Sequence, residues 1–334
     1  MIGRSYLVTG GTGFLGSALT RRLVTAGARV RVFDNDSRGH VSRLRDIDDR
    51  FEFVPGDIRD PAAVDRACEG IDVVCHLAFI NGTEFFYTKP DLVLDVAVKG
   101  IVNLIDSAIR HRVPELMVMS SSEVYHEPPT VPTDETVALS IPDALNPRYS
   151  YAAGKILHEI MALNYGRSFR RVTVVRPHNV YGADMGEEHV IPQFVARMKS
   201  LVSHPADPIP FTIQGTGLQT RSFVFVDDFI DGVMIVLERG EHLGIYHIGT
   251  LEEVTIEALA RLVAEHFGRP IKIVPGPPAE GGTNRRCPDI TKIMKLGYRP
   301  NYTLREALPG VVRWYDRQLS AAAKPQAATP PQQV

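Results

Sequence analysis

Short runs of β-branched and other apolar residues alternate with helix-length amphipathic segments through the first two-thirds of the chain. The apolar runs predict strands at residues 5–9, 29–33, 51–54, 72–76, 116–120 and 172–176. The amphipathic segments predict helices at 14–26, 61–68, 91–110 and 151–165. Because strands that alternate with helices form βαβ units with right-handed crossovers, we expect a doubly wound parallel sheet of the α/β class.

The composition and the hydrophobic pattern change after residue 178, where Pro and Gly become frequent and the apolar runs shorten. A further helix is predicted at 255–267. We expect a main domain of residues 1–178 with returning segments near 223–250, and a smaller α/β lobe formed mainly by 179–319. Residues 320–334 are rich in Ala, Pro and Gln, and they bury too little apolar surface to be ordered, so we predict a disordered tail.

The charge is nearly balanced, with 37 Lys and Arg against 39 Asp and Glu in 334 residues, a formal net charge of −2. Nucleic acids and anionic membranes call for a basic surface, so neither is an expected partner. No apolar run approaches the roughly 18–20 residues of a membrane span, and we expect no signal peptide. Cys68, Cys75 and Cys287 lack metal-like spacing, so we expect no metal site and no disulfide framework, and a cytoplasmic location.

A glycine-rich turn, TGGTGFLG at residues 9–16, follows the first predicted strand and opens the first predicted helix. Gly10, Gly13 and Gly16 have the spacing that allows a tight turn, a close approach to a pyrophosphate, and close helix–strand packing. Asp34 ends the second strand, where a carboxylate can bind a ribose 2′-OH and would repel a 2′-phosphate. This pattern predicts a Rossmann-type site for NAD rather than NADP, although the charge of nearby Arg38 would favour a phosphate.

Two further strand ends should face the cofactor. Asp57 and Ile58 follow the third strand; the Asp57 carboxylate could accept a hydrogen bond from adenine or could simply cap the next helix. Leu77 and Ala78 end the fourth strand, and the small Ala78 leaves room for a dinucleotide.

A second pattern suggests catalysis. Tyr151 and Lys155 are four residues apart on a predicted helix, so they share one face. The run SSSEVY at 120–125 ends the fifth strand, at the sheet edge where ligands bind in open α/β folds. The predicted cofactor site comprises Gly10, Gly13, Phe14, Leu15, Gly16, Asp34, Asn35, Arg38, Asp57, Ile58, Leu77 and Ala78, to which a resemblance to a known family of such motifs adds Tyr151 and Lys155.

These motifs resemble those of the extended short-chain dehydrogenase/reductase family, and within it the nucleotide-sugar epimerases and dehydratases. The resemblance covers nearly the whole chain. Besides the segments above, it is carried by HLAF at 76–79, RPHNVYG at 176–182, TRSFVFVDD at 220–228 and RRCPDI at 285–290.

The resemblance implies NAD as cofactor, a nucleotide-diphosphate sugar as substrate, and a homodimer formed through the helices near 91–110 and 151–165. It implies that Tyr151 takes the proton of a sugar hydroxyl as hydride leaves for NAD. Lys155 would lower the pKa of Tyr151 and bind the nicotinamide ribose, because an unassisted phenol with a pKa near 10 is a poor base. Ser121 would hydrogen-bond the reacting oxygen.

Other residues are expected to bind the sugar nucleotide. The resemblance implies that Asn179, Arg221, and either Arg285 or Arg286 contact the diphosphate; arginine suits this task through its bidentate geometry. The loop at 185–197 should cradle the base, and the polar-aromatic segment at 81–87 should shape the sugar pocket. The predicted substrate site comprises Thr83, Glu84, Ser122, Glu123, His178, Asn179, Val190, Ile191, Arg221, Arg285 and Arg286.

Glu123 is the residue that bears most on the reaction. A carboxylate at this position resembles the 4,6-dehydratases and uronate decarboxylases, and beside C5 of a 4-keto sugar it could remove the acidic C5 proton. We therefore expect a sugar-nucleotide dehydratase, although Ser122 stands where dTDP-glucose dehydratases have Asp. Glu123 could equally hydrogen-bond hydroxyls in a C4 epimerase. Decarboxylation of a uronic acid is a third possibility, and a non-catalytic NAD sensor is a fourth, disfavoured by the intact Tyr151 and Lys155.

Overall fold

The computed structural model describes residues 1–278 and 281–322. Seven strands within these residues form one parallel sheet in the spatial order β11-β6-β5-β4-β1-β2-β3. Their bounds are β1 (Ser5–Thr9), β2 (Arg29–Asp34), β3 (Glu52–Pro55), β4 (Val73–His76), β5 (Glu115–Met119), β6 (Arg171–Pro177) and β11 (Gly244–Ile248). The strand order reverses at β1, which confirms the doubly wound Rossmann-type fold and places a ligand crevice at the carboxyl ends of β1 and β4.

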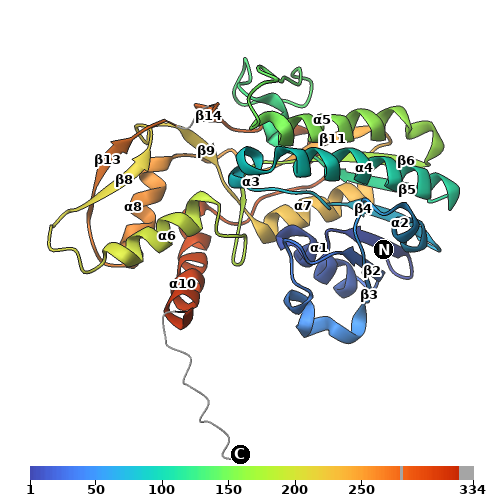
Figure 1. The fold of residues 1–334 in the computed structure, drawn as a ribbon, viewed down its shortest axis with the longest axis horizontal. Coiled ribbons are helices and arrows are strands. Elements are labelled where there is room, and N and C mark those ends of the chain that lie inside the picture. The colour runs from blue at the N-terminus through green and yellow to red at the C-terminus, as the bar shows by residue number, and fades with distance from the viewer. Residues whose placement is uncertain (279–280, 323–334) are drawn as a thin grey trace, which may run out of the picture.

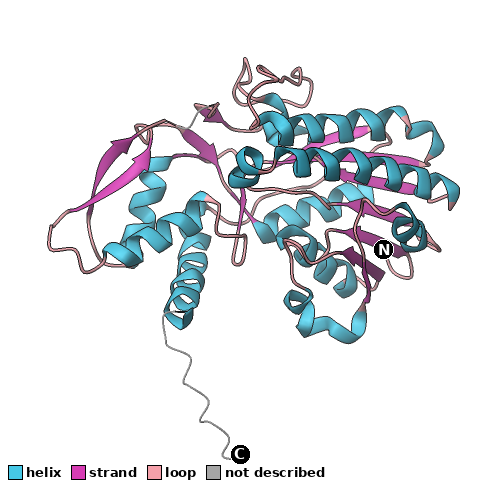
Figure 2. Cartoon of the chain, in the orientation of Figure 1, coloured by secondary structure: helices cyan, strands magenta, loops and turns pink. Residues whose placement is uncertain are grey.

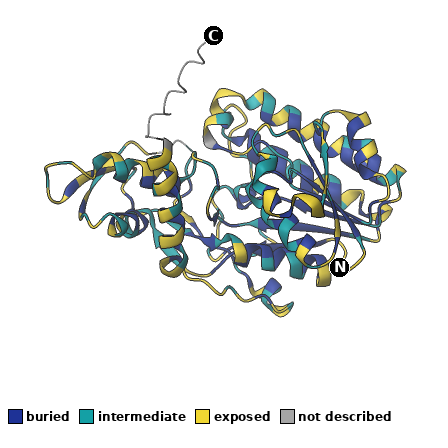
Figure 3. Ribbon diagram, turned by 90° about the horizontal axis from the view of Figure 1, so that it is seen from below, coloured by how far each residue is buried: buried dark blue, intermediate teal, exposed yellow. Residues whose placement is uncertain are grey.

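Helices cover both faces of this sheet (Figures 1 and 2). One face carries α2 (Pro61–Cys68), α4 (Pro90–Arg110) and α5 (Tyr149–Asn164), and the other carries α1 (Phe14–Thr25), α7 (Val226–Arg239) and α9 (Thr291–Lys295). Successive residues of β1 explain this layering, because Tyr6 and Val8 belong to one apolar cluster and Leu7 belongs to the other. Figure 3 shows the buried strands between helices whose outer surfaces are exposed.

Local sequence signals set the start of α2 and the end of α1. The Asp60 side chain caps α2 by accepting hydrogen bonds from the backbone N–H groups of Ala62 and Ala63, and Pro61 occupies the first turn. Gly27 follows α1 with φ of 80°, a left-handed conformation that glycine adopts without strain. Its N–H bonds to the carbonyl of Val24, which closes the last turn of α1.

The remaining segments build the smaller lobe and the loops between the two parts. The lobe contains α6 (Val190–Leu201), α8 (Ile256–His266) and α10 (Leu304–Ala322), packed against β8 (Ile209–Gln214) and β13 (Ile271–Gly276). Short strands line its junction with the main sheet: β7 (Val180–Tyr181), β9 (Thr220–Ser222), β10 (Val224–Phe225), β12 (Glu253–Thr255) and β14 (Arg285–Arg286). The other elements are α3 (Thr83–Thr88), η1 (Val41–Arg50), η2 (Ser122–Tyr125) and η3 (Gly166–Ser168).

The segment at 223–250 joins the main sheet, and the last helix runs into the predicted tail. The returning segment at 223–250 supplies β10, α7 and β11, and β11 pairs with β6. Helix α10 continues through Ala322, so residues 320–322 of the predicted tail are helical; the rest of that segment, 323–334, lies outside the described residues. No helix within 1–278 and 281–322 has both the length and the apolar character of a membrane span.

Candidate active site

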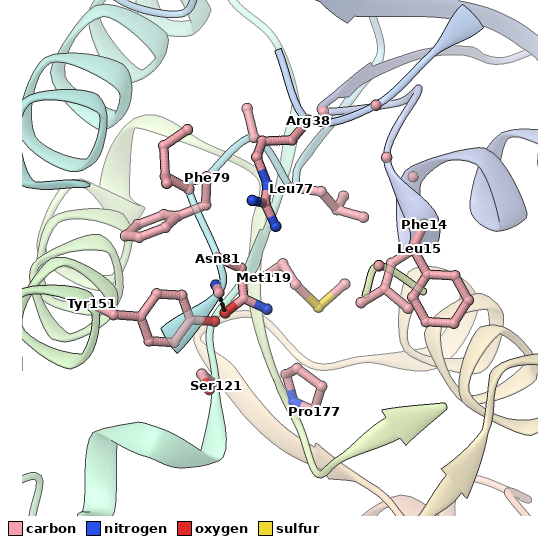
Figure 4. Close-up of a pocket in the computed structure, with 18 of the residues that line it drawn as sticks. Phe14, Leu15, Arg38, Leu77, Phe79, Asn81, Met119, Ser121, Tyr151 and Pro177 are labelled. Carbon is pink, nitrogen blue, oxygen red and sulfur yellow. Dashed lines mark hydrogen bonds between the residues drawn. The ribbon is translucent and has the colours of Figure 1, made fainter. Parts of the chain in front are cut away.

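A cavity of about 400 Å³ opens at the carboxyl edge of the sheet, beside the smaller lobe. Every residue of the predicted cofactor site contributes to its wall. Figure 4 shows Phe14, Leu15 and Leu77 on one side of this cavity, and Tyr151 with Ser121 on another. The sequence motifs therefore converge on one site.

The glycine-rich turn forms a cradle with no room for side chains. A Cβ atom on Gly10, which has φ of 72°, would lie 2.7 Å from the backbone nitrogen of Ala78, and one on Gly16 would lie 2.0 Å from the carbonyl oxygen of Gly10. Helix α1 begins after Gly13, with no side chain capping its first N–H groups. Free N–H groups at a helix start attract a pyrophosphate, so this turn fits a dinucleotide.

The end of β2 presents a fixed carboxylate to the same cavity. Asp34 accepts hydrogen bonds from the backbone N–H groups of Thr12 and Asp36, each at 3.0 Å. Arg38 turns away from it: its guanidinium donates to Glu188 at 2.9 Å and stacks 4.4 Å from the centre of the Phe85 ring. The charge of Arg38 is thus balanced by a carboxylate from the smaller lobe, so it offers little attraction to a 2′-phosphate.

We expect Asp34→Ala to narrow the preference for NAD over NADP by about 10–100-fold, because it removes a charged hydrogen bond to the 2′-OH and the repulsion of a 2′-phosphate. Dissociation constants of both cofactors, measured by calorimetry, test this. Asp48→Ala, at an exposed site in η1, is the matched control. An unchanged ratio in Asp34→Ala would show that another residue sets the cofactor preference.

The proposed proton-transfer residues come from two elements. Tyr151 lies in the first turns of α5 and Ser121 ends the segment after β5. The Tyr151 ring stacks on Phe86 with centroids 4.8 Å apart and meets the edge of Phe79 at 5.2 Å. Burial raises the pKa of the Tyr151 phenol well above 10, while a hydrogen bond with Ser121 opposes the shift. In this apolar surrounding the phenol of Tyr151 is protonated, and it needs a nearby positive charge to become a phenolate.

Lys155 lies one turn further along α5, fully within the protein. Its Nζ donates to the carbonyl of Met119 at 2.8 Å and sits 4.0 Å from the centre of the Phe79 ring. Burial lowers the pKa of Lys155 to about 7, against the opposing charge of Glu159. Its Nζ lies 5.8 Å from the centre of the Tyr151 ring, and a positive charge at this place would favour the phenolate of Tyr151.

Glu123 faces the same cavity from η2 and is held by arginines. Arg286 donates to its carboxylate at 2.6 Å, and Arg148 approaches the other oxygen at 3.8 Å. Burial alone would raise the pKa of Glu123, but the charge and hydrogen bond of Arg286, aided by Arg148 and Arg221, lower it to about 2. Glu123 is therefore ionised throughout the neutral range.

Arg148 was missed by the sequence reasoning. It lies three residues before Tyr151, and residues three apart at the start of a helix share a face, which is the signal that could have identified it.

The structure also distinguishes the two neighbouring arginines by their position. Arg286 is buried in the cavity wall, whereas Arg285 is exposed and pairs with Glu253 at 2.5 Å.

The other predicted substrate residues divide into two groups. Ser122, Asn179 and Val190 line the cavity. His178, Ile191, Arg221, Glu84 and Arg285 do not.

Packing explains most of these displaced residues. His178 is fully buried beside His247, and Ile191 is buried in the core of the smaller lobe because the apolar face of α6 packs inward. Arg221 lies behind Arg286 and donates to the carbonyls of Thr220 and Thr283, both at 2.7 Å. Glu84 is exposed on α3, and the side chain of Thr83 is outside the described part.

No group of three or more His, Cys, Asp or Glu within residues 1–278 and 281–322 is arranged to hold a metal ion. The part of the cavity wall beyond the dinucleotide cradle presents the Tyr151 phenol, the Lys155 amine and the Glu123 carboxylate, with Arg148 and Arg286 beside the carboxylate.

Comparison with known proteins identifies the family to which the chain belongs. The model of the NAD dependent epimerase/dehydratase family matches residues 6–249. The chain is 31% identical over 329 residues to UDP-glucuronic acid decarboxylase 4 of Arabidopsis thaliana, covering 97% of this chain and 71% of the relative.

Two solved structures share its fold. The dTDP-glucose 4,6-dehydratase of Streptomyces venezuelae, crystallised with NAD, is 28% identical with a TM-score of 0.84, covering 96% of this chain and 99% of that one. The UDP-glucose 4-epimerase of Thermotoga maritima, crystallised with UDP-glucose, is 27% identical with a TM-score of 0.82, covering 94% and 99%. The chain belongs to the NAD-dependent epimerase/dehydratase family, within the extended short-chain dehydrogenases/reductases, as its motifs predicted.

Proposed function

We propose that this protein is an NAD-dependent enzyme that decarboxylates the uronic acid of a nucleotide sugar through a 4-keto intermediate. The observation that carries the proposal is the ion pair between Glu123 and Arg286 in the wall of the active-site cavity. This ion pair sets how strong a base Glu123 can be at C5 of the sugar, and so which reaction can follow at C5 and C6.

A dehydratase needs a base at C5 and an acid for the oxygen that leaves C6. A carboxylate with a pKa of about 2 is a weak base, and Ser122, beside it, is a poor acid. Decarboxylation needs neither group. Once C4 is a ketone, a C6 carboxylate is β to it: the C5–C6 bond breaks, C6 leaves as CO2, and its electron pair moves to the C4 oxygen as an enolate before C5 takes up a proton.

The residues of the cavity supply the other steps. NAD, when bound, would supply the hydride acceptor for oxidation at C4 and the hydride that reduces C4 again after CO2 has left, so the sugar undergoes no net oxidation at C4. Tyr151 takes the proton of the C4 hydroxyl, and the charge of Lys155 favours its phenolate. Tyr151 and Ser121 then hydrogen-bond the developing enolate oxygen, which stabilises negative charge in a water-poor site.

Arg148 and Arg286 favour an anionic sugar. Both line the cavity next to Glu123, and Arg286 is buried. One carboxylate balances one of these two cations, so a further anion from the substrate is accommodated; a uronate supplies one at C6, in addition to the diphosphate. The identities of 31–32% with three UDP-glucuronic acid decarboxylases of Arabidopsis thaliana point in the same direction.

Dehydration is the second candidate, because Glu123 faces the cavity and dTDP-glucose 4,6-dehydratase of Streptomyces antibioticus is 31% identical to the chain. This reaction requires the substrate to draw Arg286 away from Glu123 so that the carboxylate becomes a stronger base. C4 epimerisation needs only Tyr151, Ser121 and Lys155 for its chemistry, and Glu123 would then hydrogen-bond hydroxyls of the sugar.

One experiment separates the three reactions. The enzyme is incubated in D2O with UDP-glucuronate, UDP-glucose and dTDP-glucose, and products are followed by NMR. Decarboxylation releases CO2 and gives a pentose with deuterium at C5. Formation of a 4-keto-6-deoxy sugar with deuterium at C5 instead identifies a dehydratase, and inversion at C4 with C5 protiated identifies an epimerase. NAD binding without any turnover would favour a sensor.

We also propose a homodimer, through the outer surfaces of α4 and α5. Leu94, Val98 and Val102 are spaced at four-residue intervals on α4 and are 36–44% exposed, and Ile160 on α5 is 51% exposed. An apolar stripe of this kind on paired helices suits a second copy of itself.

The three cysteines are free and buried, which supports a reducing, cytoplasmic location.

Val98→Glu is expected to convert the dimer to a monomer, because it places a charge in the centre of the apolar stripe. Analytical ultracentrifugation measures the change, and Val202→Glu, at a similarly exposed valine outside the stripe, is the control. Sedimentation of wild type as a monomer at micromolar concentration would refute the dimer.

A further inference from the structure

A buried ion pair lies behind the active site, between α5 and β6. Glu159 is on α5, one turn after Lys155, and Arg176 is near the end of β6. The Arg176 guanidinium donates to both carboxylate oxygens of Glu159, from Nε at 2.8 Å and from Nη2 at 2.5 Å. Both side chains are buried, and neither contributes to the wall of the active-site cavity. The pair can therefore affect the reaction only through other residues.

Every side-chain polar atom of this ion pair has a partner. The Ser120 hydroxyl donates to the carboxylate of Glu159. Nη1 of Arg176 donates to the Tyr125 hydroxyl and, at 3.0 Å, to the carbonyl of Glu135. A buried ion pair is often no more stabilising than apolar side chains of similar volume. The packing of α5 on the sheet is therefore not a sufficient reason for two buried charges at this place.

The ion pair helps to hold the segment that carries Ser121. The hydroxyl of the preceding residue, Ser120, is fixed by Glu159, and the carbonyl of Met119 accepts a hydrogen bond from Lys155 at 2.8 Å. Two residues of α5 that are four apart thus bind two successive residues at the end of β5. These contacts fix the point at which the chain presents Ser121 to the cavity.

The charge of Glu159 also bears on Lys155, because residues four apart on a helix are neighbours. The other titratable groups around Lys155 are His76 on β4 and His158 and Tyr151 on α5. Burial lowers the pKa of both histidines far below neutrality and raises the pKa of Tyr151, so all three are uncharged at pH 7. Among these described neighbours, Glu159 supplies the negative charge that opposes the effect of burial on the pKa of Lys155.

We propose that Glu159 is a positioning residue for the reaction: its carboxylate keeps the Lys155 ammonium charged beside Tyr151 and, held by Arg176, fixes the backbone that presents Ser121. This inference rests on the proposed roles of Tyr151 and Lys155 in oxidation at C4. It applies equally to decarboxylation, dehydration and epimerisation, because all three begin with that step.

The ionisation of Lys155 can be measured by NMR of the NAD-saturated enzyme with ¹³C at the ε carbon of its lysines, and Lys155→Met identifies the signal. The double variant Glu159→Gln/Arg176→Gln removes both charges and leaves neither buried alone, so it is expected to fold. Its Lys155 should titrate about one pH unit lower than in wild type, where the pKa is about 7. Glu115→Gln is the matched control, because it removes another buried carboxylate, which pairs with Arg171 at the start of β6. It should leave the titration of Lys155 unchanged.

Turnover gives a second readout. Lys155 is charged below its pKa, so its contribution is lost as the pH rises through that value. In the double variant this alkaline limb of kcat should move to lower pH by the same amount, and kcat at pH 7.5 should fall by about five- to tenfold. The apolar double variant Glu159→Met/Arg176→Met should behave in the same way, whichever side chains fill the space.

The two readouts separate this inference from the proposed function. If no nucleotide sugar is turned over, the proposed function fails, and the NMR titration still decides the role of Glu159. A Lys155 that titrates as in wild type in both double variants would overturn the proposal. So would an equal displacement in Glu115→Gln, since the loss of any buried carboxylate of the sheet would then have the same effect.

Discussion

Tyr151→Phe is expected to lower kcat by about 10²–10⁴-fold whatever the nucleotide sugar, because it removes the hydroxyl that takes the C4 proton. The ring itself stays in place, since Phe keeps the stacking on Phe86 and the edge contact with Phe79. Affinity for NAD should therefore change little. Steady-state turnover and calorimetric NAD binding, measured on the same preparation, separate the two effects.

Tyr165→Phe is the matched control, because Tyr165 follows the same helix and is 43% exposed. Its turnover should equal that of wild type. If Tyr151→Phe kept kcat within a factor of about ten of wild type, another group would be the base, and the proposed reaction would lose its first step.

Glu123→Gln is expected to lower kcat/KM by about 30–100-fold, because loss of the carboxylate leaves the buried guanidinium of Arg286 without its charged partner. Exposed Glu69→Gln is the control. The pH profile gives the second readout. With a pKa of about 2, Glu123 is already ionised above pH 4. The pH profile of kcat/KM for wild type should therefore contain no acid limb caused by Glu123, and Glu123→Gln should leave the shape of the profile unchanged.

The opposite outcome is equally informative. If the profile of wild type has an acid limb near neutrality that Glu123→Gln abolishes, Glu123 is a base, its pKa rises when substrate binds, and dehydration replaces decarboxylation as the favoured reaction. Unchanged turnover in Glu123→Gln would remove this residue from the mechanism altogether.

The dinucleotide cradle could be predicted from sequence because its parts are local. The glycine spacing, the strand before it and the helix after it lie within about 20 residues, and Asp34 ends the next strand along the chain. The alternation of strands and helices then fixes which strand ends share an edge. These relations depend on backbone geometry and chain connectivity, so they could be derived from residue order.

The environment of Glu123 could not be predicted in this way. Its partner Arg286 is 163 residues away and reaches it through β14, which pairs with β9 in a register that places Arg286 beside Arg221. A strand of two residues has no periodicity to show which side chain faces inward, so Arg285 and Arg286 were equivalent in the sequence.

The sequence by itself determined the sheet, the cofactor cradle and the pairing of Tyr151 with Lys155, because each follows from spacing along one or two elements. Only the tertiary structure decided the charge states of the site. Arg38 is neutralised by Glu188, and Glu123 is held ionised by Arg286, through contacts 150 and 163 residues apart. A pKa depends on burial and on nearby charges, and both are set by packing between segments that residue order does not place side by side.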